Sequence, residues 1–463
     1  MSIRFGTSGW RAIIADEFTF NNVRRVTEAI CGYLTTEKPA SGQILIIGCD
    51  SRFMGEKFSA IAAEIAAAKG FRVLLCTGQT PTPAISFAIR SLKASGALNF
   101  TASHNPPEYQ GIKFSTYDGA PALPEVTQKI EAAIIDEDVS SDVAGGSIQE
   151  YDARPDYLKD LAAKINLTAI SESKGRFAYD ALWGTGRGYL DKILRDAGCE
   201  VETINDWRDV TFGGRSPEPG EDHVDELRER VLTKKLTLGI ATDGDADRFG
   251  IIDSDGTFIT PNQLIAVLTD YLADSRGWTN GVARSVATSH LVDRVAAERG
   301  LKLYETPVGF KFIGELINKD EIILGGEESA GLSIRGHYPE KDGILACLLA
   351  IEAVTVRQSS LSDQLSELYK RVGKLESGRI GVKLDENVAA RLKEKLAQEP
   401  NDIGGRKIEK INRIDGVKFL FAGSDWMLMR PSGTEPMVRI YAESESKQEL
   451  EALLEAGRSY LLE

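Results

Sequence analysis

Three aspartates at alternate positions, in the stretch DGDADR (243–248), are well placed to bind a metal ion. Asp243, Asp245 and Asp247 follow an apolar run, so we expect them where a buried strand ends. Three carboxylates this close repel one another unless a cation neutralises them. Hard oxygen ligands suit Mg²⁺, whose other positions are often filled by water or phosphate oxygens. The pattern predicts a magnesium site with Arg248 near a bound phosphate, and an acidic turn without metal is the alternative.

A serine stands in a comparable place in TASHNPPEYQGIK (101–113), also after an apolar run. His104 is the immediate neighbour of Ser103, but adjacent side chains usually point apart, and a GxSxG pattern is absent. A hydrolase triad is therefore poorly supported. A serine that carries a phosphoryl group beside a metal fits better, with Lys113 as a nearby acid or base. We expect one polar loop here, shaped by its prolines and Gly111 so that Lys113 returns toward Ser103.

Hydroxyl and guanidinium groups gather in RPSGTEPMVR (430–439), between two strand-like runs. The side-chain donors there, which surround Gly433, are Arg430, Ser432, Thr434 and Arg439. Such donors, together with free backbone N–H groups, bind a phosphate dianion. Pro-Ser-Gly-Thr is also an ordinary turn sequence, so a phosphate site and a plain turn both remain open.

Acidic and hydroxyl side chains occur together in GGEESAG (325–331), after the strand-like run EIIL. Glu327, Glu328 and Ser329 on this glycine-flanked loop could hydrogen-bond sugar hydroxyls, although acidic surface turns are common. Two further stretches, TPVGFK and HYPEKDG, bring other candidates nearby in the sequence: Lys311, His337 and Lys341.

The composition limits the classes of protein that fit. The chain has 463 residues and a net charge of −14, which argues against a general binder of nucleic acid or anionic membranes. Five scattered cysteines without a CxxC pair favour reduced thiols in a cytosolic protein. The N-terminus lacks an apolar signal region, and the most apolar run, 344–354, is too short to span a bilayer. We expect a cytoplasmic protein with a small-molecule substrate and no nucleic-acid or membrane partner.

Short apolar runs alternate with segments of helical periodicity over most of the chain, which is typical of α/β units. The expected buried strands are 44–48, 72–76, 97–101, 176–180, 201–204, 236–243, 282–288, 302–306 and 321–326. In the C-terminal part, strands expected at 379–384, 417–422, 426–430 and 437–443 flank helices expected at 386–398 and 446–461. We predict three α/β domains, 1–147, 148–254 and 255–372, followed by an α+β domain, 373–463.

Five stretches occur in a particular order along the chain: FGTSGWR (5–11), TASHNP (101–106), DGDADR (243–248), GEES (326–329) and RPSGTEP (430–436). In this combination the sequence resembles the α-D-phosphohexomutase family, which includes phosphoglucomutases, phosphomannomutases and phosphoglucosamine mutases. The resemblance implies three α/β domains and a C-terminal α+β domain around a central cleft, to which each domain donates one loop. A monomer and a dimer both fit this architecture.

The resemblance implies a role for each matching residue. Ser103 would be the phosphoserine and would bind Mg²⁺ together with Asp243, Asp245 and Asp247. Lys113 matches a lysine that the family uses in general acid/base catalysis. The other residues of the implied catalytic set are Arg11, His104 and Arg248. The implied substrate site comprises Gly309, Glu327, Ser329 and Lys341 for the phosphosugar and Arg430, Ser432, Gly433, Thr434 and Arg439 for its non-reacting phosphate.

The implied reaction moves phosphate reversibly between the C1 and C6 oxygens of a hexose. Phospho-Ser103 donates to a sugar monophosphate, the hexose 1,6-bisphosphate turns over within the cleft, and its other phosphate returns to Ser103. Phosphoryl transfer depends mainly on positioning and charge neutralisation, which agrees with the residue types present.

Departures from the family pattern bear on the sugar and on the alternatives. Ala330 and Gly331 follow GEES where dual-specificity enzymes carry a histidine, which favours glucose over mannose. GTSGWR differs from the GTDGIRG usual in phosphoglucosamine mutases, which makes glucosamine phosphate a less favoured alternative substrate. A non-catalytic phosphosugar-binding protein would lose the serine or the metal ligands, and both are retained. A phosphatase that uses a phosphoserine would share the chemistry of the serine and the metal but would admit water to the phosphoserine.

Overall fold

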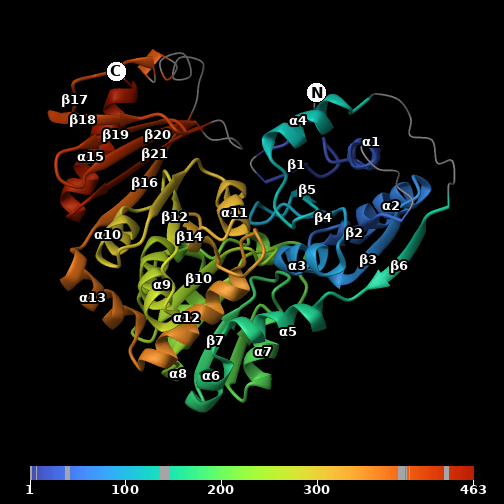
Figure 1. Ribbon diagram of the computed structural model, residues 1–463, viewed down its shortest axis with the longest axis horizontal. Helices are drawn as coiled ribbons and strands as arrows, with labels where there is room; N and C mark the ends of the chain where they lie inside the picture. The colour runs from blue at the N-terminus through green and yellow to red at the C-terminus, as the bar shows by residue number, and fades with distance from the viewer. Residues whose placement is uncertain are drawn as a thin grey trace.

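The structure of the protein is a computed structural model (Figure 1), which describes residues 3–6, 8–36, 42–135, 145–383, 392, 394–395, 397–431 and 437–462. Its described strands form four sheets. In Figure 1 the first sheet (blue) and the fourth (red) lie on opposite sides, with the second and third, coloured green to yellow, below and between them. The predicted fold class, three α/β units followed by an α+β unit, is confirmed.

The first sheet has helices on both of its faces. Its strands, in spatial order, are β1 (Trp10–Ile13), β5 (Tyr109–Thr116), β4 (Gly96–Phe100), β2 (Ile44–Cys49), β3 (Arg72–Gln79) and β6 (Ser147–Tyr151). Its helices are α1 (Phe20–Leu34), α2 (Gly55–Ala68), α3 (Thr82–Leu92) and α4 (Pro124–Ala132). Side chains alternate between the faces of a strand, so Leu45 and Ile47 of β2 pack with α1 and α2 while Ile46 packs with α3. Burial on both faces explains why β2 is apolar throughout.

The second and third sheets repeat much of this plan. The second consists of β11 (Phe258–Ile259), β10 (Phe249–Asp253), β9 (Leu238–Thr242), β7 (Arg176–Asp180) and β8 (Glu200–Ile204). The third consists of β13 (Leu303–Thr306), β12 (Gly281–Ser285), β14 (Ile322–Glu327) and β15 (Gly331–Ile334). The helices of these two units are α5 (Arg154–Lys164), α6 (Leu167–Ser173), α7 (Leu190–Asp196), α8 (Asp225–Lys234), α9 (Pro261–Arg276), α10 (Leu291–Glu298), α11 (Phe310–Asn318), α12 (Gly343–Arg357) and α13 (Leu361–Val372). Every strand expected from the sequence in the three α/β units is present.

One feature of the three sheets was missed by sequence reasoning. The orders β5-β4-β2-β3, β10-β9-β7-β8 and β15-β14-β12-β13 are equivalent. In each order the second and third strands are parallel, and the first and second strands form an antiparallel pair. The two strands of that antiparallel pair follow each other in the chain. The serine, the aspartates and the GEES stretch therefore all lie where the chain turns between two paired strands.

The stretch 101–113 is not one polar loop, and that expectation was wrong. The loop covers residues 101–108, and β5 begins at Tyr109, so Gly111 and Lys113 lie in a strand paired with β4 and β1. A Cβ at Gly111 would lie 2.5 Å from the carbonyl oxygen of Thr101 and 2.6 Å from that of Trp10. Gly111 thus allows close packing of the backbone, and the strand rather than a loop presents Lys113.

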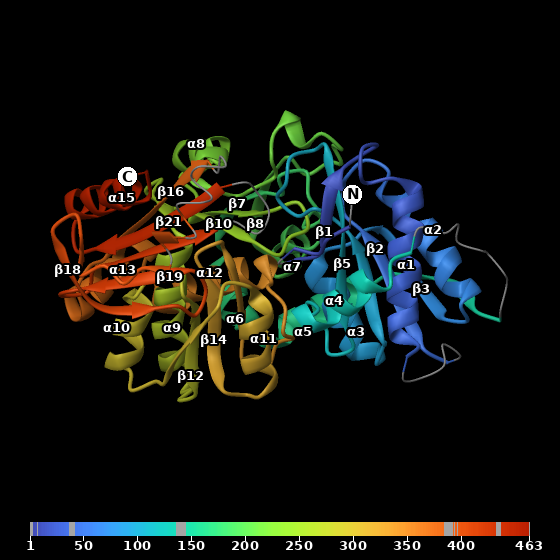
Figure 2. The ribbon, with the colours of Figure 1, turned by 90° about the horizontal axis from the view of Figure 1, so that it is seen from above.

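The fourth sheet is antiparallel and lies against the third unit (Figure 2). Its strands are β16 (Glu376–Lys383), β21 (Met437–Ser444), β20 (Trp426–Pro431), β19 (Val417–Phe421), β18 (Arg406–Asn412) and β17 (Asp402–Ile403). One face packs on α15 (Lys447–Leu462), which was expected near 446–461. On the other face, Trp426 and Tyr441 contact Val286 and Ala287 of the third unit. The helix expected at 386–398 falls largely outside the described residues.

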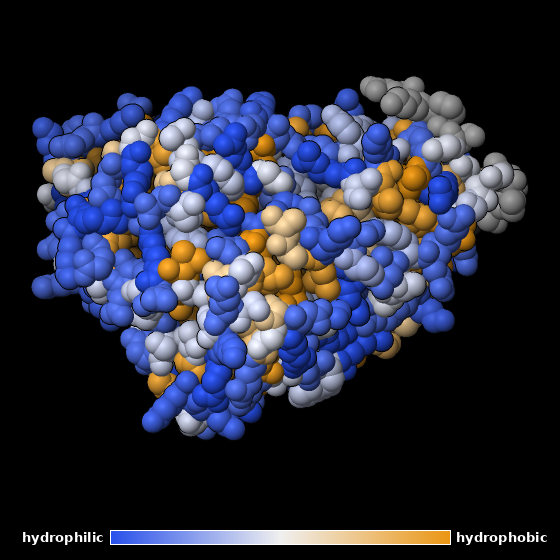
Figure 3. Space-filling view, turned by 60° about the horizontal axis from the view of Figure 1, so that its bottom comes forward, coloured by the Kyte–Doolittle hydropathy of each residue, from blue (hydrophilic) through white to orange (hydrophobic). Residues whose placement is uncertain are grey.

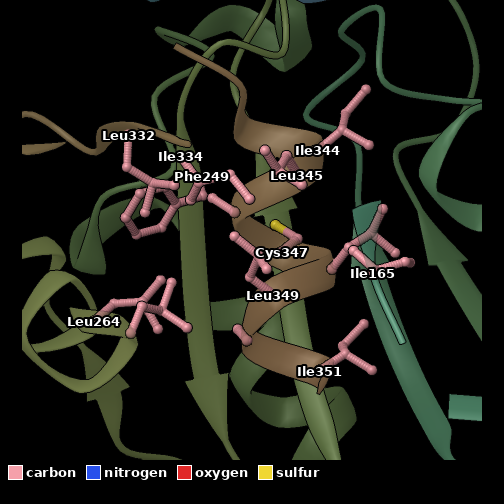
Figure 4. Packing of buried hydrophobic residues seen from close by; sticks show 14 of the residues in the cluster. Ile165, Phe249, Leu264, Leu332, Ile334, Ile344, Leu345, Cys347, Leu349 and Ile351 are labelled. Carbon is pink, nitrogen blue, oxygen red and sulfur yellow. The ribbon is translucent and has the colours of Figure 1, made fainter. Parts of the chain in front are cut away.

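Helix α12, which contains the most apolar run of the sequence, lies in the largest core cluster (Figure 4). Cys347 and Leu349 are fully buried there beside Phe249 and Leu332 from neighbouring sheets. Within the described part of the chain, no single helix has the length and apolar character to cross a membrane; α12 and α13 meet those criteria only as a pair bent by 78°. Figure 3 shows a surface that is mostly hydrophilic, with exposed hydrophobic residues in scattered groups.

Candidate active site

A cleft of about 240 Å³ is lined by residues from all four units of the chain. The predicted site residues that line it are Arg11, His104, Arg248, Gly309, Glu327, Ser329, Lys341, Arg430 and Arg439. Ser103, Lys113 and the three aspartates are buried next to it. Ser432, Gly433 and Thr434 lie outside the described residues. The chain thus brings together side chains that are separated by more than 400 positions in the sequence.

Ser103 is held in a strained backbone conformation at the bottom of its loop. Its φ is +51°, in the left-handed region, which costs a non-glycine residue roughly 1–2 kcal/mol. Its amide donates to Oγ1 of Thr101 over 2.8 Å, and its hydroxyl donates to Oδ2 of Asp243 over 2.7 Å. The side chain is 1% exposed. The nucleophile candidate of the first unit is therefore aimed at the aspartate loop of the second.

The aspartate loop is packed with cationic partners. Lys113 donates to Oδ2 of Asp245 over 2.5 Å and to Oδ2 of Asp247 over 2.6 Å. Lys341 donates to the same oxygen of Asp247 over 2.7 Å. The amide of Arg248 donates to Oδ1 of Asp243 over 3.0 Å. Two other segments of the chain, those of Lys113 and Lys341, thus converge on this loop.

The donor set fits a divalent cation. One carboxylate oxygen from each of Asp243, Asp245 and Asp247 lies within 4.8 Å of the others. Oδ1 of Asp245 and Oδ1 of Asp247 are buried and accept no hydrogen bond from the residues that the structure describes. Buried carboxylate oxygens are seldom left without a partner, and an all-oxygen set of this kind suits Mg²⁺.

The carboxylates of this loop do not share one pKa. Burial, reinforced by the charges of Asp245 and Asp247, raises the pKa of Asp243 well above its usual value. Burial acts the same way on Asp247, but the ammonium groups of Lys113 and Lys341 outweigh it and hold the pKa of that carboxyl well below its usual range. Burial lowers the pKa of Lys113, and its two aspartate partners more than reverse this. Lys113 is therefore a charged donor in this arrangement.

His104 is close to Ser103 but is not arranged as a triad base. Its Nδ1 lies 3.4 Å from the Ser103 hydroxyl oxygen. Burial, together with the charges of Arg248 and Arg11, holds the pKa of the imidazole well below its usual value, so the ring is neutral. Among the described residues, none offers His104 the carboxylate partner that orients the base of a triad.

Cations surround the open part of the cleft. Arg11 donates to Oδ1 of Asn105 over 2.5 Å, and burial beside Arg248 lowers its pKa to about 10. Arg430 and Arg439 are opposite each other on β20 and β21. Arg430 also donates to Asp415 over 2.8 Å. Like charges on paired strands are unfavourable unless an anion lies between or beside them, which is a suitable setting for a phosphate.

The GEES loop brings a carboxyl group to the other wall. Glu327 accepts a hydrogen bond from the amide of Gly309 over 2.7 Å, and burial beside Glu328 raises its pKa to about 7. Glu328 accepts from the hydroxyls of Ser285 and Thr288 at 3.2 and 3.4 Å. Glu327, Glu328 and Ser329 all line the cleft.

Two residues singled out in the sequence lie elsewhere. His337 is buried, and its Nε2 contacts Oδ2 of Asp342 at 2.9 Å, away from the cleft lining. Lys311 lines a separate hollow between α4 and α11. Of the three basic candidates near the GEES stretch, Lys341 alone reaches the site.

Sequence reasoning missed a partner of the aspartate loop on α3. The hydroxyl of Thr82 donates to Oδ2 of Asp245 over 2.5 Å, and its amide donates to the carbonyl of Asp245 over 3.0 Å. Asn99 in turn donates to the Thr82 hydroxyl over 2.7 Å. The sequence offers only a weak signal for this contact, since Thr82 and Asn99 are single polar residues beside apolar ones. Their meeting with Asp245 depends on how the first two units dock.

Comparisons with known proteins match the chain to one family along most of its length. The first, second and third α/β/α domains of phosphoglucomutase/phosphomannomutase match residues 2–140, 155–256 and 260–372, and the C-terminal domain matches 381–458. A phosphoglucomutase/phosphomannomutase from Thermococcus kodakarensis is 29% identical over 99% of this chain and 98% of its own. A phosphoglucosamine/phosphogalactosamine mutase from Sulfurisphaera tokodaii is 28% identical over 96% and 95%. A crystal structure from Thermus thermophilus, provisionally described as a phosphomannomutase, is 34% identical over 100% of both chains, with a TM-score of 0.86.

Proposed function

The chain belongs to the phosphoglucomutase/phosphomannomutase family, and on that premise we propose that it interconverts hexose 1-phosphates and hexose 6-phosphates through a phosphoserine. One observation carries the proposal. The buried hydroxyl of Ser103 is hydrogen-bonded to a carboxylate of the aspartate loop 140 residues away, beside a cleft that every unit of the chain lines. Membership of the family supports the mutase chemistry, and the geometry supports the assignment of Ser103.

Ser103 would carry the phosphoryl group between the two positions of the sugar. In the first half, a sugar hydroxyl oxygen attacks the phosphorus of phospho-Ser103; its bond to phosphorus forms as the Ser103 Oγ–P bond breaks. The resulting 1,6-bisphosphate turns over in the cleft. In the second half, Ser103 Oγ attacks the other phosphate, which leaves the sugar and restores phospho-Ser103. Residues of the cleft contribute positioning and charge, which dominate phosphoryl transfer.

The three aspartates and the Ser103 oxygen would hold Mg²⁺. Bound there, the ion supplies positive charge to the non-bridging phosphoryl oxygens. The chain itself places further cations around the same group: Lys113 and Lys341 contact Asp247, and Arg248 lines the cleft. We assign proton transfer to Nζ of Lys113, which contacts Asp245 and Asp247 in the loop that Ser103 faces. The charged group would donate a proton to the Ser103 oxygen as it leaves and take one back from the attacking sugar hydroxyl. Arg11 and the neutral ring of His104 would contact the phosphoryl oxygens.

The opposite wall would bind the rest of the substrate. Arg430 and Arg439 provide guanidinium groups for the non-reacting phosphate. We assign Ser432, Gly433 and Thr434 to the same phosphate from the sequence, since they lie outside the described residues. Glu327 and Ser329 would form hydrogen bonds with sugar hydroxyls. The amide of Gly309 donates to Glu327 and would hold its carboxyl group in place.

Glucose phosphate is our first choice of substrate, with mannose phosphate second. The sequence after GEES supports it, because Ala330 and Gly331 stand where dual-specificity enzymes carry a histidine. Glucosamine phosphate is the alternative to both, and the name of the Sulfurisphaera tokodaii relative favours it.

A direct comparison of the three 1-phosphates tests the proposal. Purified protein is given Mg²⁺ and a catalytic amount of the matching 1,6-bisphosphate, and kcat/KM is measured for glucose, mannose and glucosamine 1-phosphates. We expect 6-phosphate formation with the highest kcat/KM for glucose. A highest value for glucosamine would replace the substrate assignment. Release of free phosphate without isomer formation would instead indicate a phosphatase and contradict the mutase.

A further inference from the structure

We propose that Arg52 is a positioning residue that holds the backbone of the serine loop so that Ser103 faces the aspartates. The inference rests on the proposed function in one respect, the role of Ser103 as phosphate carrier. Arg52 follows β2 in the stretch CDSR (49–52) and does not line the cleft. It therefore acts through the loop and not through contact with a substrate.

Every N–H of the Arg52 guanidinium has an acceptor, and four of the five acceptors are carbonyl oxygens of one short segment. Nη2 donates to the carbonyls of Ser103 and Asn105, each over 2.6 Å. Nη1 donates to those of Pro106 and Tyr109 over 2.8 and 2.9 Å. Nε donates to Oδ2 of Asp50 over 3.1 Å. A guanidinium has five N–H groups in a fixed fork, so this side chain is fully used.

The charge of Arg52 is matched where it lies. The side chain is 0% exposed, and so is that of its partner Asp50. Its guanidinium carbon lies 5.0 Å from the centre of the Phe212 ring, which comes from the second unit. A buried cation paired with a carboxylate and stacked on an aromatic ring is stable only in a well-defined geometry. Arg52 is thus suited to fix a neighbouring segment rigidly.

The same pair also reaches the amide side of Ser103. Asp50 accepts from the hydroxyl of Thr101 over 2.6 Å, and that hydroxyl oxygen accepts from the amide of Ser103 over 2.8 Å. Both the N–H and the C=O of Ser103 are therefore tied, directly or through one residue, to the Asp50–Arg52 pair. A left-handed φ persists only where the surroundings impose it, and these bonds impose it here.

The prolines of the loop fit this arrangement. The carbonyls of Asn105 and Pro106 turn toward Arg52, and the peptide bonds they belong to continue into Pro106 and Pro107. Proline has no N–H, so turning these carbonyls inward leaves no amide donor to be satisfied on the opposite side. The sequence SHNPP thus suits a loop whose carbonyls converge on one cation.

Variants of Arg52 and Thr101 test the inference. Arg52→Lys keeps the positive charge but lacks the fork, so it cannot reach four carbonyls. Thr101→Val removes the link from Asp50 to the Ser103 amide, whereas Thr101→Ser keeps the hydroxyl. Arg276→Lys is the control: Arg276, on α9 of the third unit, is partly buried and pairs with the buried Glu352 and with the carbonyl of Lys164.

Three readouts are measured on each full-length variant: kcat and KM, the rate of Ser103 phosphorylation by hexose 1,6-bisphosphate, and hydrogen–deuterium exchange of the peptide containing 101–109. For Arg52→Lys we expect kcat and the phosphorylation rate to fall about 100-fold with KM unchanged, since small misplacements of a reacting group have effects of this size. Exchange of 101–109 should become faster. Thr101→Val should show the same pattern more weakly, and Thr101→Ser and Arg276→Lys should resemble wild type.

Each contrary result has a distinct meaning. Wild-type kcat and exchange in Arg52→Lys would overturn the inference, as would an equal loss of kcat in Arg276→Lys. If Arg52→Lys does not fold, the Thr101→Val and Thr101→Ser pair decides by the same criteria. If the wild-type protein is neither phosphorylated nor active, the proposed function fails, whereas the exchange of 101–109 in the variants still decides whether Arg52 holds the loop.

Discussion

The serine loop (101–108) and the aspartate loop (243–248) occupy the same place in sheets of equivalent strand order, yet they differ in how cations hold them. The backbone carbonyls of the serine loop converge on one buried cation, Arg52. In the aspartate loop the cations bind side chains instead: the carboxylates of Asp245 and Asp247 accept from the ammonium groups of Lys113 and Lys341. The Ser103 hydroxyl donates to Asp243 and pairs with no ammonium group among the described residues, whereas Asp245 and Asp247 are committed to ammonium partners.

Under the proposed function, the difference follows from what each loop would have to present. A nucleophile must keep its hydroxyl available, so its loop is best fixed through main-chain atoms. Metal ligands must offer oxygens to a cation, and the lysines neutralise them until one is bound. The same hairpin topology therefore supports two chemistries, and the surrounding side chains, not the strands, distinguish them.

The largest effect should come from removing the group that the serine loop presents. Ser103→Ala should lower mutase activity by roughly a thousandfold or more, because a covalent carrier has no substitute. Thermal unfolding should change little, since the other contacts of the loop are made by its backbone. The control is Ser59→Ala, which removes another buried hydroxyl of the same unit, bonded to the carbonyl of Gly55. Activity in Ser103→Ala close to that of Ser59→Ala would contradict the assignment.

A smaller effect is expected when one carboxylate of the aspartate loop is replaced by an amide. Asp245→Asn should weaken Mg²⁺ binding by at least about tenfold, because one ligand charge is lost. The Mg²⁺ concentration that gives half-maximal activity, and calorimetric titration with Mg²⁺ alone, both measure this. Asp255→Asn in the exposed turn after β10, which caps the amide of Thr257, should leave both unchanged. An unaltered Mg²⁺ dependence in Asp245→Asn would remove this residue from the ligand set.

The third hairpin loop extends the comparison, because among the described residues no ammonium or guanidinium group pairs with the carboxyl group of Glu327. The folded protein raises the pKa of Glu327 from 4.5 to about 7. Folding then favours the protonated form, so this group lowers stability as pH rises from about 4.5 to 7, by about 3 kcal/mol in full. Glu327→Gln should gain stability relative to wild type over this window in denaturant unfolding without sugar phosphate. The exposed Glu315→Gln should not, and a pH-independent difference for Glu327→Gln would contradict the burial argument.

The smallest effect is expected from removing the hydrogen bond of Thr82, which joins the unit of the serine loop to the unit of the aspartate loop. Thr82→Val removes a hydroxyl that bonds Asp245 and Asn99 and should cost about 1–2 kcal/mol of unfolding free energy. Thr27→Val is the control, because the buried Thr27 hydroxyl has no hydrogen-bond partner among the described residues. Denaturant unfolding measures both. Equal effects of the two substitutions would show that the Thr82 bond contributes nothing specific.

Much of the fold could be predicted because many of its strands are buried on both faces and are therefore largely apolar. Strands β2, β4 and β9 are of this kind. Strand β5 was missed because its sequence follows two prolines and contains Gly111 and Lys113. Its conformation is decided by pairing with β1 and β4 on both sides, which a single sequence does not reveal. Strand β18 was missed because its charged residues belong to a largely exposed strand.

The candidate site was predictable where a loop carries several chemical groups in a row, as in DGDADR. It was not predictable where one side chain acts from another segment, as Arg52 and Thr82 do. The stretch CDSR (49–52) did offer a signal, since its polar residues stand at the end of a buried strand, as those of the aspartate loop do. What Arg52 contacts depends on the packing of β2 against the serine loop. That packing is a property of the folded chain.

The central claim is that Ser103 carries the phosphoryl group, and a label-transfer experiment tests it most directly. The protein is incubated with hexose 1,6-bisphosphate labelled in its phosphates, digested and mapped, and a second sample is chased with unlabelled hexose 1-phosphate. We predict label on Ser103 alone, and its loss during the chase into hexose bisphosphate and hexose 6-phosphate. Label on another residue such as His104, or label recovered only as free phosphate, would contradict the account.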